Sequence, residues 1–431
     1  MVKAHDILGM NARQQDYVSL NSSRAKAFCS SKYATKVLLE NKGIATARIF
    51  GVLTSNEDVN EFEWTTLEKN FVVKPTNGNA GKGVLIFRSK IENKELWVDT
   101  LGRNWTLDEI RMHCFDILAG QYSTYGTQHQ VIVEERITIH SSFEKYVYKG
   151  TPDIRVIVYN HVPVMAMLRL PTIESQGRAN LHQGAIAVGV DIATGITTHG
   201  ITGSGIPIRT VPDSKRKLNG LKIPLWQKTL QVAVEAADAA GLAFCGVDLF
   251  ISEERGPLIV ELNANPGLSI QLANRAGMRR RLERVKDLNV LGAAHGVKIG
   301  QVLFAESFAD KIKAEEGLII VPPREDITIY DDISSNSKHA NEVDALMNTG
   351  RFRSAISRQL AEELNLIQVE DLLWYQVEKD ETKSPVIEVN IKIRSRKIKT
   401  AMVVLKRLDK TPYKIEIGRH DLVGFLVGEN E

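Results

Sequence analysis

Hydrophobic positions along the first 310 residues recur with two different periods, which predicts a mixture of helices and strands. Runs with apolar residues at every third or fourth position that stop at a glycine indicate amphipathic helices, as in 32–42 before Gly43. Short runs rich in Val and Ile, bounded by turn residues, indicate strands. The expected helices are 32–42, 224–241 and those around 269–290 and 294–316, and the expected strands are 71–75, 84–88, 131–135, 153–159 and 162–170.

The pattern changes at Leu318, after which short strands rich in β-branched residues alternate with turns. A chain of 431 residues is long enough to form two or three domains. We therefore expect a first, mixed domain over residues 1–310 and a second, mostly β domain over residues 318–431.

Composition narrows the class of protein. Hydrophobic residues make up 43% of the chain and charged residues 25%, and the formal net charge of +3 is too small to predict a nucleic-acid partner. The three cysteines match no zinc or disulfide spacing. The chain has no apolar signal core at its start and no run of apolar residues long enough to span a membrane. We expect a soluble, cytoplasmic protein with no membrane partner.

The segment Val247–Gly267 (VDLFISEERGPLIVELNANPG) predicts a β-hairpin that gathers oxygen ligands. Glu261 and Asn263 are two residues apart, so a strand points both side chains from one face. Asp248 precedes Glu261 by thirteen residues, which lets a hairpin bring it alongside. These hard donors suit Mg²⁺ carrying phosphate. The alternative is a solvated hairpin, but apolar neighbours such as Leu249 favour burial, and a buried acid without a partner is costly.

A second candidate is the glycine-rich segment Asn77–Gly83 (NGNAGKG), in which Gly78, Gly81 and Gly83 let backbone N–H groups turn toward an anion. Because it joins two expected strands, we expect it to lie over phosphates as a flap. Lys74 stands just before it and can neutralise phosphate oxygens. The alternative is a glycine-rich hairpin without a ligand.

The end of the expected strand 131–135 adds a third element. A strand whose last residues leave the sheet can offer main-chain groups to the edge of an adenine, and Glu135 could accept a hydrogen bond from the exocyclic amine. The alternative is that Glu135 is simply solvated. The three elements together indicate a nucleotide site.

In the order lysine, glycine loop, strand ending in Glu, Asp-x-Arg, Arg-x-Asn and Asp…Glu-x-Asn, the chain resembles the ATP-grasp superfamily. Within it, the chain is similar to the alpha-L-glutamate ligases, which extend a protein or peptide with glutamate, and to the subgroup called alpha-L-glutamate ligase-like proteins. The resemblance covers about residues 5–305. The motifs that carry it are Ile7–Arg13, Lys32–Lys36, Asp153–Arg155, Ala166–Arg169, Arg178–Gly184, Gly246–Leu249 and Glu261–Gly267.

The resemblance implies an α+β ATP-grasp fold, in which two α+β subdomains clasp ATP. It implies ATP and two Mg²⁺ ions as cofactors, with Mn²⁺ as an alternative ion. The implied reaction activates a carboxylate as an acyl phosphate, which an amine then attacks. We expect an amino acid, with glutamate favoured, to be added to a peptide or protein acceptor. The alternatives are a small-molecule acceptor and a non-catalytic, nucleotide-binding scaffold.

The resemblance also implies which residues form the nucleotide site. Lys36 and Lys74 would bind phosphates, with Lys32 as the alternative to Lys36. Asp153 would lie beside the nucleotide. The adenine site would be lined by Glu135, Arg136 and Ile137, and the metal ions would be held by Asp248, Glu261 and Asn263.

The remaining roles concern the reacting groups. Arg178 and Asn180 would lie beside the γ-phosphate, where Arg178 would stabilise the transferred phosphoryl group. Arg155 and Arg169 could clamp substrate carboxylates, but each could equally form a structural ion pair. His182 could take the amine proton, although a structural role is the more common one for such a histidine.

The chain departs from these ligases in two places. Only about thirty residues precede the first expected helix, so we expect the usual N-terminal α/β domain to be missing and part of the acceptor site to come from elsewhere. The gap between Glu135 and Asp153 is longer than usual, and its insert, including 140–148, could contact substrate.

In the second domain, Ala345–Gly350 and Ile415–Leu422 resemble small retropepsin-like barrels of the ATP-dependent zinc protease type, over about residues 320–429. There, an Asp-Thr-Gly turn is catalytic, but Asn348 replaces the aspartate. An aspartic protease needs two carboxyls that share a proton, and an amide cannot titrate. We therefore hypothesise a non-catalytic module that forms a homodimer or binds the acceptor peptide.

Overall fold

The computed structural model describes residues 3–67, 70–77, 82–91, 95–122, 129–304, 319–330, 340–367, 372–377, 383–423 and 425–428. The chain divides into two compact units, residues 1–286 and residues 287–431. The junction that we expected between residues 310 and 318 falls largely among residues that are not described. Helix α9 (Ala293–Leu303), expected at 294–316, belongs to the second unit.

The first unit begins with short helices whose ends follow from local sequence. Ser22 and Ser31 each accept a hydrogen bond from a backbone N–H three residues later and so start a helix. The second of these ends before Gly43, whose φ of +73° suits a glycine. This confirms the helix predicted at 32–42. The helices are α1 (Met10–Ala12), α2 (Ser23–Ser30) and α3 (Lys32–Asn41).

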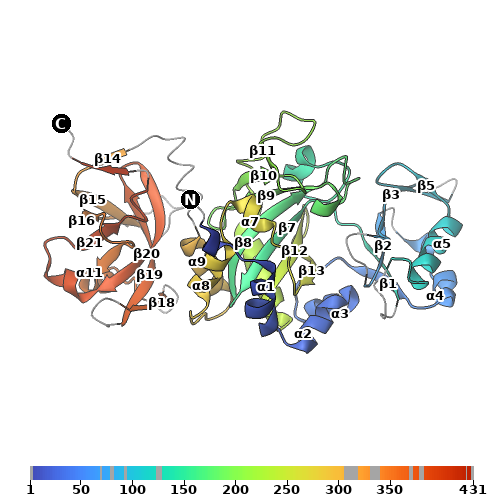
Figure 1. The fold of residues 1–431 in the computed structure, drawn as a ribbon, viewed down its shortest axis with the longest axis horizontal. Coiled ribbons are helices and arrows are strands. Elements are labelled where there is room, and N and C mark those ends of the chain that lie inside the picture. The colour runs from blue at the N-terminus through green and yellow to red at the C-terminus, as the bar shows by residue number, and fades with distance from the viewer. Residues whose placement is uncertain are drawn as a thin grey trace. The chain divides into compact units, whose positions relative to one another are not determined.

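A six-stranded sheet follows, in the order β1-β6-β2-β3-β4-β5 (Figure 1). One face packs a core that includes Phe71, Val73, Val131 and Val133. Because side chains alternate along a strand, Lys74 and Glu134 point from the other face. The strands are β1 (Ile49–Leu53), β2 (Phe71–Pro75), β3 (Leu85–Ile91), β4 (Leu96–Asp99), β5 (Asn104–Trp105) and β6 (Val131–Glu135), and the helices beside them are α4 (Asn56–Glu61) and α5 (Leu107–Leu118).

The second sheet of this unit has seven strands in the order β11-β10-β9-β8-β7-β12-β13. Both expected hairpins are present, because β7 pairs with β8 and β12 pairs with β13 in antiparallel fashion. The strands are β7 (Asp153–Tyr159), β8 (Val162–Leu170), β9 (Ile186–Val190), β10 (Thr197–Ile201), β11 (Pro207–Ile208), β12 (Phe244–Ser252) and β13 (Gly256–Asn263). The helices packed on this sheet are α6 (Trp226–Ala239), α7 (Ile270–Asn274) and α8 (Met278–Val285).

Two short connections join the sheets of the first unit. Ahead of β1, Thr46 forms a parallel bridge with Ile259 of β13. Beyond β6, Ile139 forms an antiparallel bridge with Ser252 at the end of β12. The β12–β13 hairpin therefore contacts both connections, and it ties the site residues that it carries to those of the six-stranded sheet.

The second unit is a β-barrel closed by six strands, because β15, at one end of the order β15-β16-β21-β17-β20-β19-β18, also pairs with β19. Its interior is filled by apolar side chains such as Ile356, Val389 and Ile417. Asn348 lies in register with Gly418 on parallel strands. The strands are β14 (Ile319–Val321), β15 (Arg324–Tyr330), β16 (Ala340–Asn348), β17 (Ala355–Ser357), β18 (Leu372–Val377), β19 (Lys383–Ile393), β20 (Arg396–Leu405), β21 (Ile415–Gly418) and β22 (Phe425–Val427), and helix α11 (Arg358–Glu363) follows β17.

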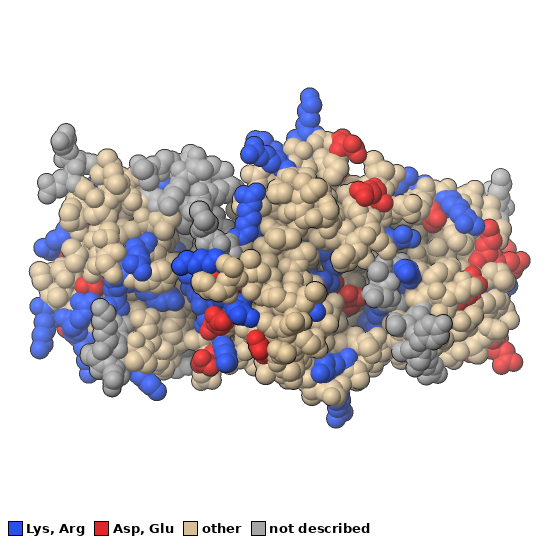
Figure 2. All heavy atoms as spheres, viewed as in Figure 1, with Lys and Arg blue, Asp and Glu red and all other residues tan. Residues whose placement is uncertain are grey.

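Two further observations concern the surface. On the face drawn in Figure 2, Lys and Arg side chains are interspersed with uncharged ones. Within the described part of the chain, every helix is too short or too polar to pass through a lipid bilayer.

Candidate functional site

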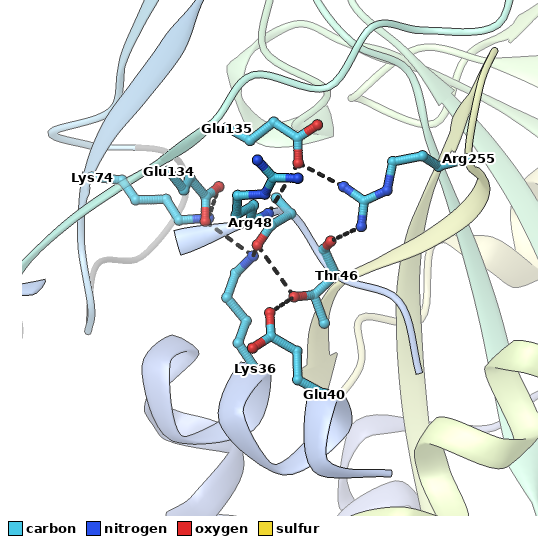
Figure 3. Close-up of polar contacts among 9 residues, drawn as sticks. Lys36, Glu40, Thr46, Arg48, Lys74, Glu134, Glu135 and Arg255 are labelled. Carbon is cyan, nitrogen blue, oxygen red and sulfur yellow. Dashed lines mark hydrogen bonds and ion pairs between the residues drawn. The ribbon is translucent and has the colours of Figure 1, made fainter. Parts of the chain in front are cut away.

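The first half of the candidate site is a buried carboxylate between two lysines (Figure 3). Oε1 of Glu134 lies 2.5 Å from Nζ of Lys74, and Oε2 lies 3.0 Å from Nζ of Lys36. Lys36 also donates to the carbonyl of Ala47 at 3.2 Å. All three charged side chains are at most 9% exposed. Two lysines that we assigned to phosphate binding are thus held together by one acid from the neighbouring strand.

In this cluster the carboxylate and the two ammonium groups stabilise one another's charges, while the two ammonium groups repel each other. Burial alone would raise the pKa of Glu134, but Lys74 and Lys36 outweigh it and the pKa is lowered. Burial, together with the nearby charge of Lys74, lowers the pKa of Lys36 to about 8. Sequence reasoning missed Glu134. The signal that was available is strand alternation, since Val131 and Val133 face the core and Glu134 must therefore share the opposite face with Lys74.

Glu135, which we expected to bind adenine, is already engaged by the protein (Figure 3). Its Oε2 accepts from Nη1 of Arg255 at 2.6 Å and from the backbone N–H of Arg48 at 3.1 Å. Arg255 also donates through Nη2 to the carbonyl of Thr46 at 2.9 Å. Arg255 stands at the tip of the β12–β13 hairpin, so it joins that hairpin to the end of β6 and to the segment ahead of β1. Contact of Glu135 with adenine stays a prediction.

The two residues after Glu135 lie where the chain leaves β6. Ile137 is buried, and Arg136 donates from Nη1 to Oδ1 of Asn70 at 3.4 Å. Burial lowers the pKa of Arg136, with a smaller effect from Arg88. Their role at an adenine site stays a prediction too.

The second half of the site is one face of the seven-stranded sheet. Asp248 on β12 lies directly opposite Arg155 on β7 and opposite Glu261 on β13. Residues paired across strands share a face, and so do residues two apart in one strand. The same face therefore also carries Asp153, Arg169 and Asn263, from the register pairs Asp153–Arg169 and Gly246–Asn263.

Ion pairs occupy the arginines on this face. Arg155 binds Asp248 through two hydrogen bonds of 2.7 and 2.6 Å. Arg169 binds both oxygens of Asp153 and also reaches Oδ2 of Asp248 at 2.6 Å. The two arginines thus form the structural ion pairs that we gave as the alternative to substrate clamps. Their contact with a substrate stays a prediction.

The pKa values of the two aspartates on this face are shifted in opposite directions. Burial raises the pKa of both groups, but at Asp248 the charges of Arg155 and Arg169 outweigh burial and the pKa is lowered. At Asp153 burial prevails, and the nearby charge of Asp248 adds to the rise in pKa. The two guanidinium groups therefore keep Asp248 ionised.

Lys32 lies within electrostatic reach of both halves of the site. Burial lowers the pKa of Lys32, the charges of Glu261 and Glu134 oppose that effect, and the charge of Lys74 adds to it. Its backbone N–H donates to the carbonyl of Thr76, just before the glycine loop, at 3.2 Å. The role of Lys32 as the alternative to Lys36 in phosphate binding stays a prediction.

The oxygen donors fit magnesium. Among the described residues, Oδ1 of Asp248 receives one side-chain hydrogen bond, from the Nε–H of Arg155, which leaves it a lone pair. Glu261 and Asn263 are partly exposed, and Oδ1 of Asn263 accepts from the backbone of Asn265 at 2.9 Å. In the described part of the chain, no three His, Cys, Asp or Glu side chains gather to hold a metal, so the candidate set is two carboxylates and one amide.

Several predicted residues lie away from these contacts. Arg178 and His182 are exposed on the loop after β8, and Asn180 caps a short turn by accepting from the backbone of His182 at 3.0 Å. Within the described ranges, no side-chain contact joins these three residues to Asp248. Of the glycines, Gly78 and Gly81 lie outside the described residues, while the carbonyl of Gly83 meets Nε2 of His113 at 2.9 Å.

The two sheets, one carrying the lysine cluster and the other carrying the carboxylates, have the α+β architecture expected of an ATP-grasp protein. The chain belongs to the sugar-transfer associated ATP-grasp family, whose model matches residues 12–287.

Curated relatives support the same class. A probable alpha-L-glutamate ligase of Photobacterium profundum is 26% identical over 253 residues, covering 59% of this chain and 61% of that protein. One of a Marinomonas species is 34% identical over 119 residues, or 28% of each chain. The expected similarity to ATP-grasp proteins and to glutamate ligases is confirmed. Because the chain spans less than two thirds of these relatives, the activity of the whole protein remains a proposal.

Among solved structures, the chain is similar to D-alanine–D-alanine ligase from Bacillus anthracis, with 15% identity and a TM-score of 0.35 over 72% of this chain and 78% of that one. It is also similar to the ATP-grasp ligase PsnB complexed with minimal precursor, with 16% identity and a TM-score of 0.33 over 61% and 60%. The retropepsin-like identity of the second unit stays a prediction.

Proposed function

We propose that this protein is an ATP-dependent ligase that joins a carboxylate to an amine through an acyl phosphate. The observation that carries the proposal is that Arg255 binds Glu135 and Thr46 and so ties the hairpin of Asp248 and Glu261 to the sheet of the Lys74–Glu134 ion pair. A site that only bound an acid or only bound phosphate would not need both halves. A non-catalytic scaffold would not need them either.

In the proposed reaction, a carboxylate oxygen of one substrate attacks the γ-phosphorus of ATP and ADP leaves. The amine nitrogen of the other substrate then attacks the acyl carbon, phosphate leaves, and the nitrogen loses a proton. Lys36 and Lys74, held by Glu134, would bind the nucleotide phosphates. Arg178 would meet the charge that develops on the transferred phosphoryl group, and Asn180 would orient it.

Asp248, Glu261 and Asn263 would hold magnesium, two ions as in the implied mechanism, which would neutralise phosphate charge. The chain's own contribution is to keep those three donors in register on one sheet face. Arg155 on the neighbouring strand β7 and Arg169 on β8 hold Asp248 in place, and Asp153 would lie beside the nucleotide. His182 is our candidate for taking the amine proton.

For the substrates, we propose an amino acid, glutamate in the first place, and a peptide or protein acceptor. The names of the curated relatives support glutamate. The description of the matching family, which refers to sugar transfer, instead favours the second candidate, a small-molecule acceptor. We place the reaction in the cytoplasm, which the free cysteines Cys29, Cys114 and Cys245 support.

The test is release of ADP from ATP and Mg²⁺ with each of the twenty amino acids in turn. We expect release that depends on one amino acid and on an acceptor, and we expect Glu261→Ala to abolish it while the fold is retained. Glu254→Ala is the matched control, because Glu254 is exposed near the tip of the same hairpin. Wild-type rates in Glu261→Ala would refute the site, and release without any amino acid would refute the ligase.

A further inference from the structure

Hydrogen bonds hold the N-terminal motif Ile7–Arg13 in place within the first unit. The side chain of Gln271 on α7 accepts from the backbone N–H of Leu8 at 2.9 Å and donates to its carbonyl at 3.1 Å. The same Oε1 accepts from the backbone of Met278 at 2.9 Å. One buried amide thus satisfies both backbone groups of Leu8, so the residues that follow hold a defined position.

Arg13, at the end of this motif, reaches the turn that follows the metal-type oxygens. Its Nη1 donates to the carbonyl of Pro266 at 2.8 Å. The ring of Pro266 in turn lies over Gly246, where an added Cβ would be 2.9 Å from Pro266 and 3.6 Å from Cδ of Arg155. Gly246 is in register with Asn263. Arg13 therefore contacts Pro266, and Pro266 packs on Gly246 of the face that carries the candidate metal site.

Arg13 also begins a single π-helical turn, Arg13–Tyr17. Such turns are uncommon and are frequently found at functional sites, because they re-aim a side chain. The Nε–H of Arg13 is shielded from solvent and meets no hydrogen-bond acceptor within the described ranges. Burial lowers the pKa of Arg13, and no carboxylate contributes to that shift.

The two arginines on the sheet face of Asp248 differ from Arg13 in this respect. Arg155 and Arg169 are already neutralised by Asp248 and Asp153. A substrate carboxylate that entered this face would therefore have to displace one of those ion pairs or find another cation. Arg13 is a cation at the rim of the face whose charge no acid in the described part of the chain neutralises.

We propose that Arg13 binds the carboxylate of the amino-acid substrate. This rests on the proposed ligase function and extends it to one residue. A carboxylate is favoured over a nucleotide phosphate because Lys36 and Lys74, which we assign to the phosphates, lie on the other half of the site. A guanidinium fork with one N–H group spent on Pro266 keeps donors for a planar carboxylate.

The test is equilibrium binding by the full chain, measured by calorimetry with Mg²⁺ and a non-hydrolysable ATP analogue present. The probes are the twenty amino acids and, for the one that binds, its form with the α-carboxylate amidated and, where it has one, its form with the side-chain carboxylate amidated. We expect Arg13→Gln to weaken binding of that amino acid by about tenfold or more, with affinity for the ATP analogue unchanged. One amidated form should bind the wild type as weakly as the unmodified amino acid binds the variant.

Two variants guard against misfolding. Arg13→Gln keeps an amide that can still donate to Pro266, and Arg13→Lys keeps the charge without the fork, so it should bind with intermediate affinity. Arg24→Gln is the matched control, because Arg24 is exposed on α2, and it should bind like the wild type. Unfolding midpoints of all variants should agree.

The inference is overturned if Arg13→Gln binds the amino acid like the wild type, if it weakens the ATP analogue equally, or if the wild type binds no amino acid. These results differ from failure of the ligase proposal, which is decided by ADP release. Arg13-dependent binding without ADP release would support the role of Arg13 and refute the ligase. ADP release that Arg13→Gln leaves unchanged would support the ligase and refute the role of Arg13.

Discussion

Lys74 and Glu134 form a buried ion pair of 2.5 Å between neighbouring strands of the six-stranded sheet. The pair is more than a local contact, because the second carboxylate oxygen of Glu134 meets Lys36 of helix α3. A phosphate-binding group from a helix and one from a sheet thus share one acid, which fixes the spacing between two cations before any nucleotide arrives.

Replacing that acid should be costly. In Glu134→Gln, two buried ammonium groups lose their shared carboxylate, and we expect the free energy of unfolding of the first unit to fall by about 3–5 kcal/mol. Affinity for an ATP analogue should fall as well. In the control Glu135→Gln the ion pair with Arg255 is partly exposed, so the loss should be below about 1 kcal/mol. Urea unfolding measures both, and equal stability of the two variants would contradict the expectation.

Nucleotide binding should depend on pH through Lys36. Its pKa is lowered to about 8, so Lys36 loses its proton as the pH rises through that value. Loss of one charged phosphate contact should weaken binding of an ATP analogue by about tenfold above that pH. Calorimetry across this range is the measurement. Lys36→Met should bind weakly at every pH, and a wild-type step that persists in this variant would assign the effect elsewhere.

The same shift has the opposite sign for stability. An unfolded Lys36 keeps its proton up to about 10.5, its ordinary value. Between about 8 and 10.5 the unfolded state therefore holds more protons than the folded state. The contribution of Lys36 to the free energy of unfolding consequently rises with pH over this window. Unfolding through Lys36 does not account for weaker binding above pH 8.

Removal of the guanidinium at the hairpin tip should affect function more than stability. Arg255 joins the β12–β13 hairpin to Glu135 and Thr46, but it is partly exposed, so Arg255→Ala should lose less than about 1 kcal/mol of stability. Because the two halves of the site would then be less firmly aligned, we expect turnover to fall severalfold. The turnover of Arg255→Lys, which can reach only one of the two acceptors, should lie between those of the wild type and Arg255→Ala. Steady-state kinetics with unfolding curves would separate the effects, and unchanged turnover in Arg255→Ala would be contrary evidence.

Substitutions of Asp248 and Asn263 should separate an effect on stability from an effect on metal binding. Asp248→Asn leaves Arg155 and Arg169 short of a buried carboxylate, so it should cost about 3–5 kcal/mol as well as activity. Asn263→Ala removes only a partly exposed amide and should abolish most activity with a stability change below about 1 kcal/mol. Thermal unfolding and ADP release test this pair. Full activity in Asn263→Ala would remove Asn263 from the metal set.

The barrel should lack protease activity. Oδ1 of Asn348 accepts from the backbone of Gly350 and Arg351 at 3.1 and 3.2 Å, and an amide there cannot share a proton with a second acid. We expect no peptide cleavage by the purified chain and no change on Asn348→Ala. Cleavage that disappeared in Asn348→Ala would refute the non-catalytic assignment.

Local pattern predicted the elements well where the chain determines its own structure. The hairpin of β7 and β8 has the expected bounds, because alternation and turn residues are local signals. The helical stretch expected around 269–290 instead holds two short helices. The first ends before Arg275, whose φ is +48°, and the second starts after Gly277, where an added Cβ would lie 2.2 Å from the carbonyl of Asp6.

The site shows the same division. Asp248, Glu261 and Asn263 follow from spacing within one hairpin and do share a sheet face. The partners of Asp248 could not be predicted, because Arg155 lies 93 residues away in sequence and meets it only through the register of β7 with β12. Strand alternation could have placed Glu134 on the face of Lys74, but its contact with Lys36 could not be predicted, because no local pattern specifies how that helix packs.

Although β15 closes onto β19, strand β18 pairs only with β19 and leaves its other edge open among the strands that the structure describes. Another polypeptide could extend the sheet through its own backbone beside Leu372–Val377. Tyr375 and Val377 are each 60% exposed on that strand. The same six residues are therefore a place for strand addition and for unwanted stacking of crowded copies.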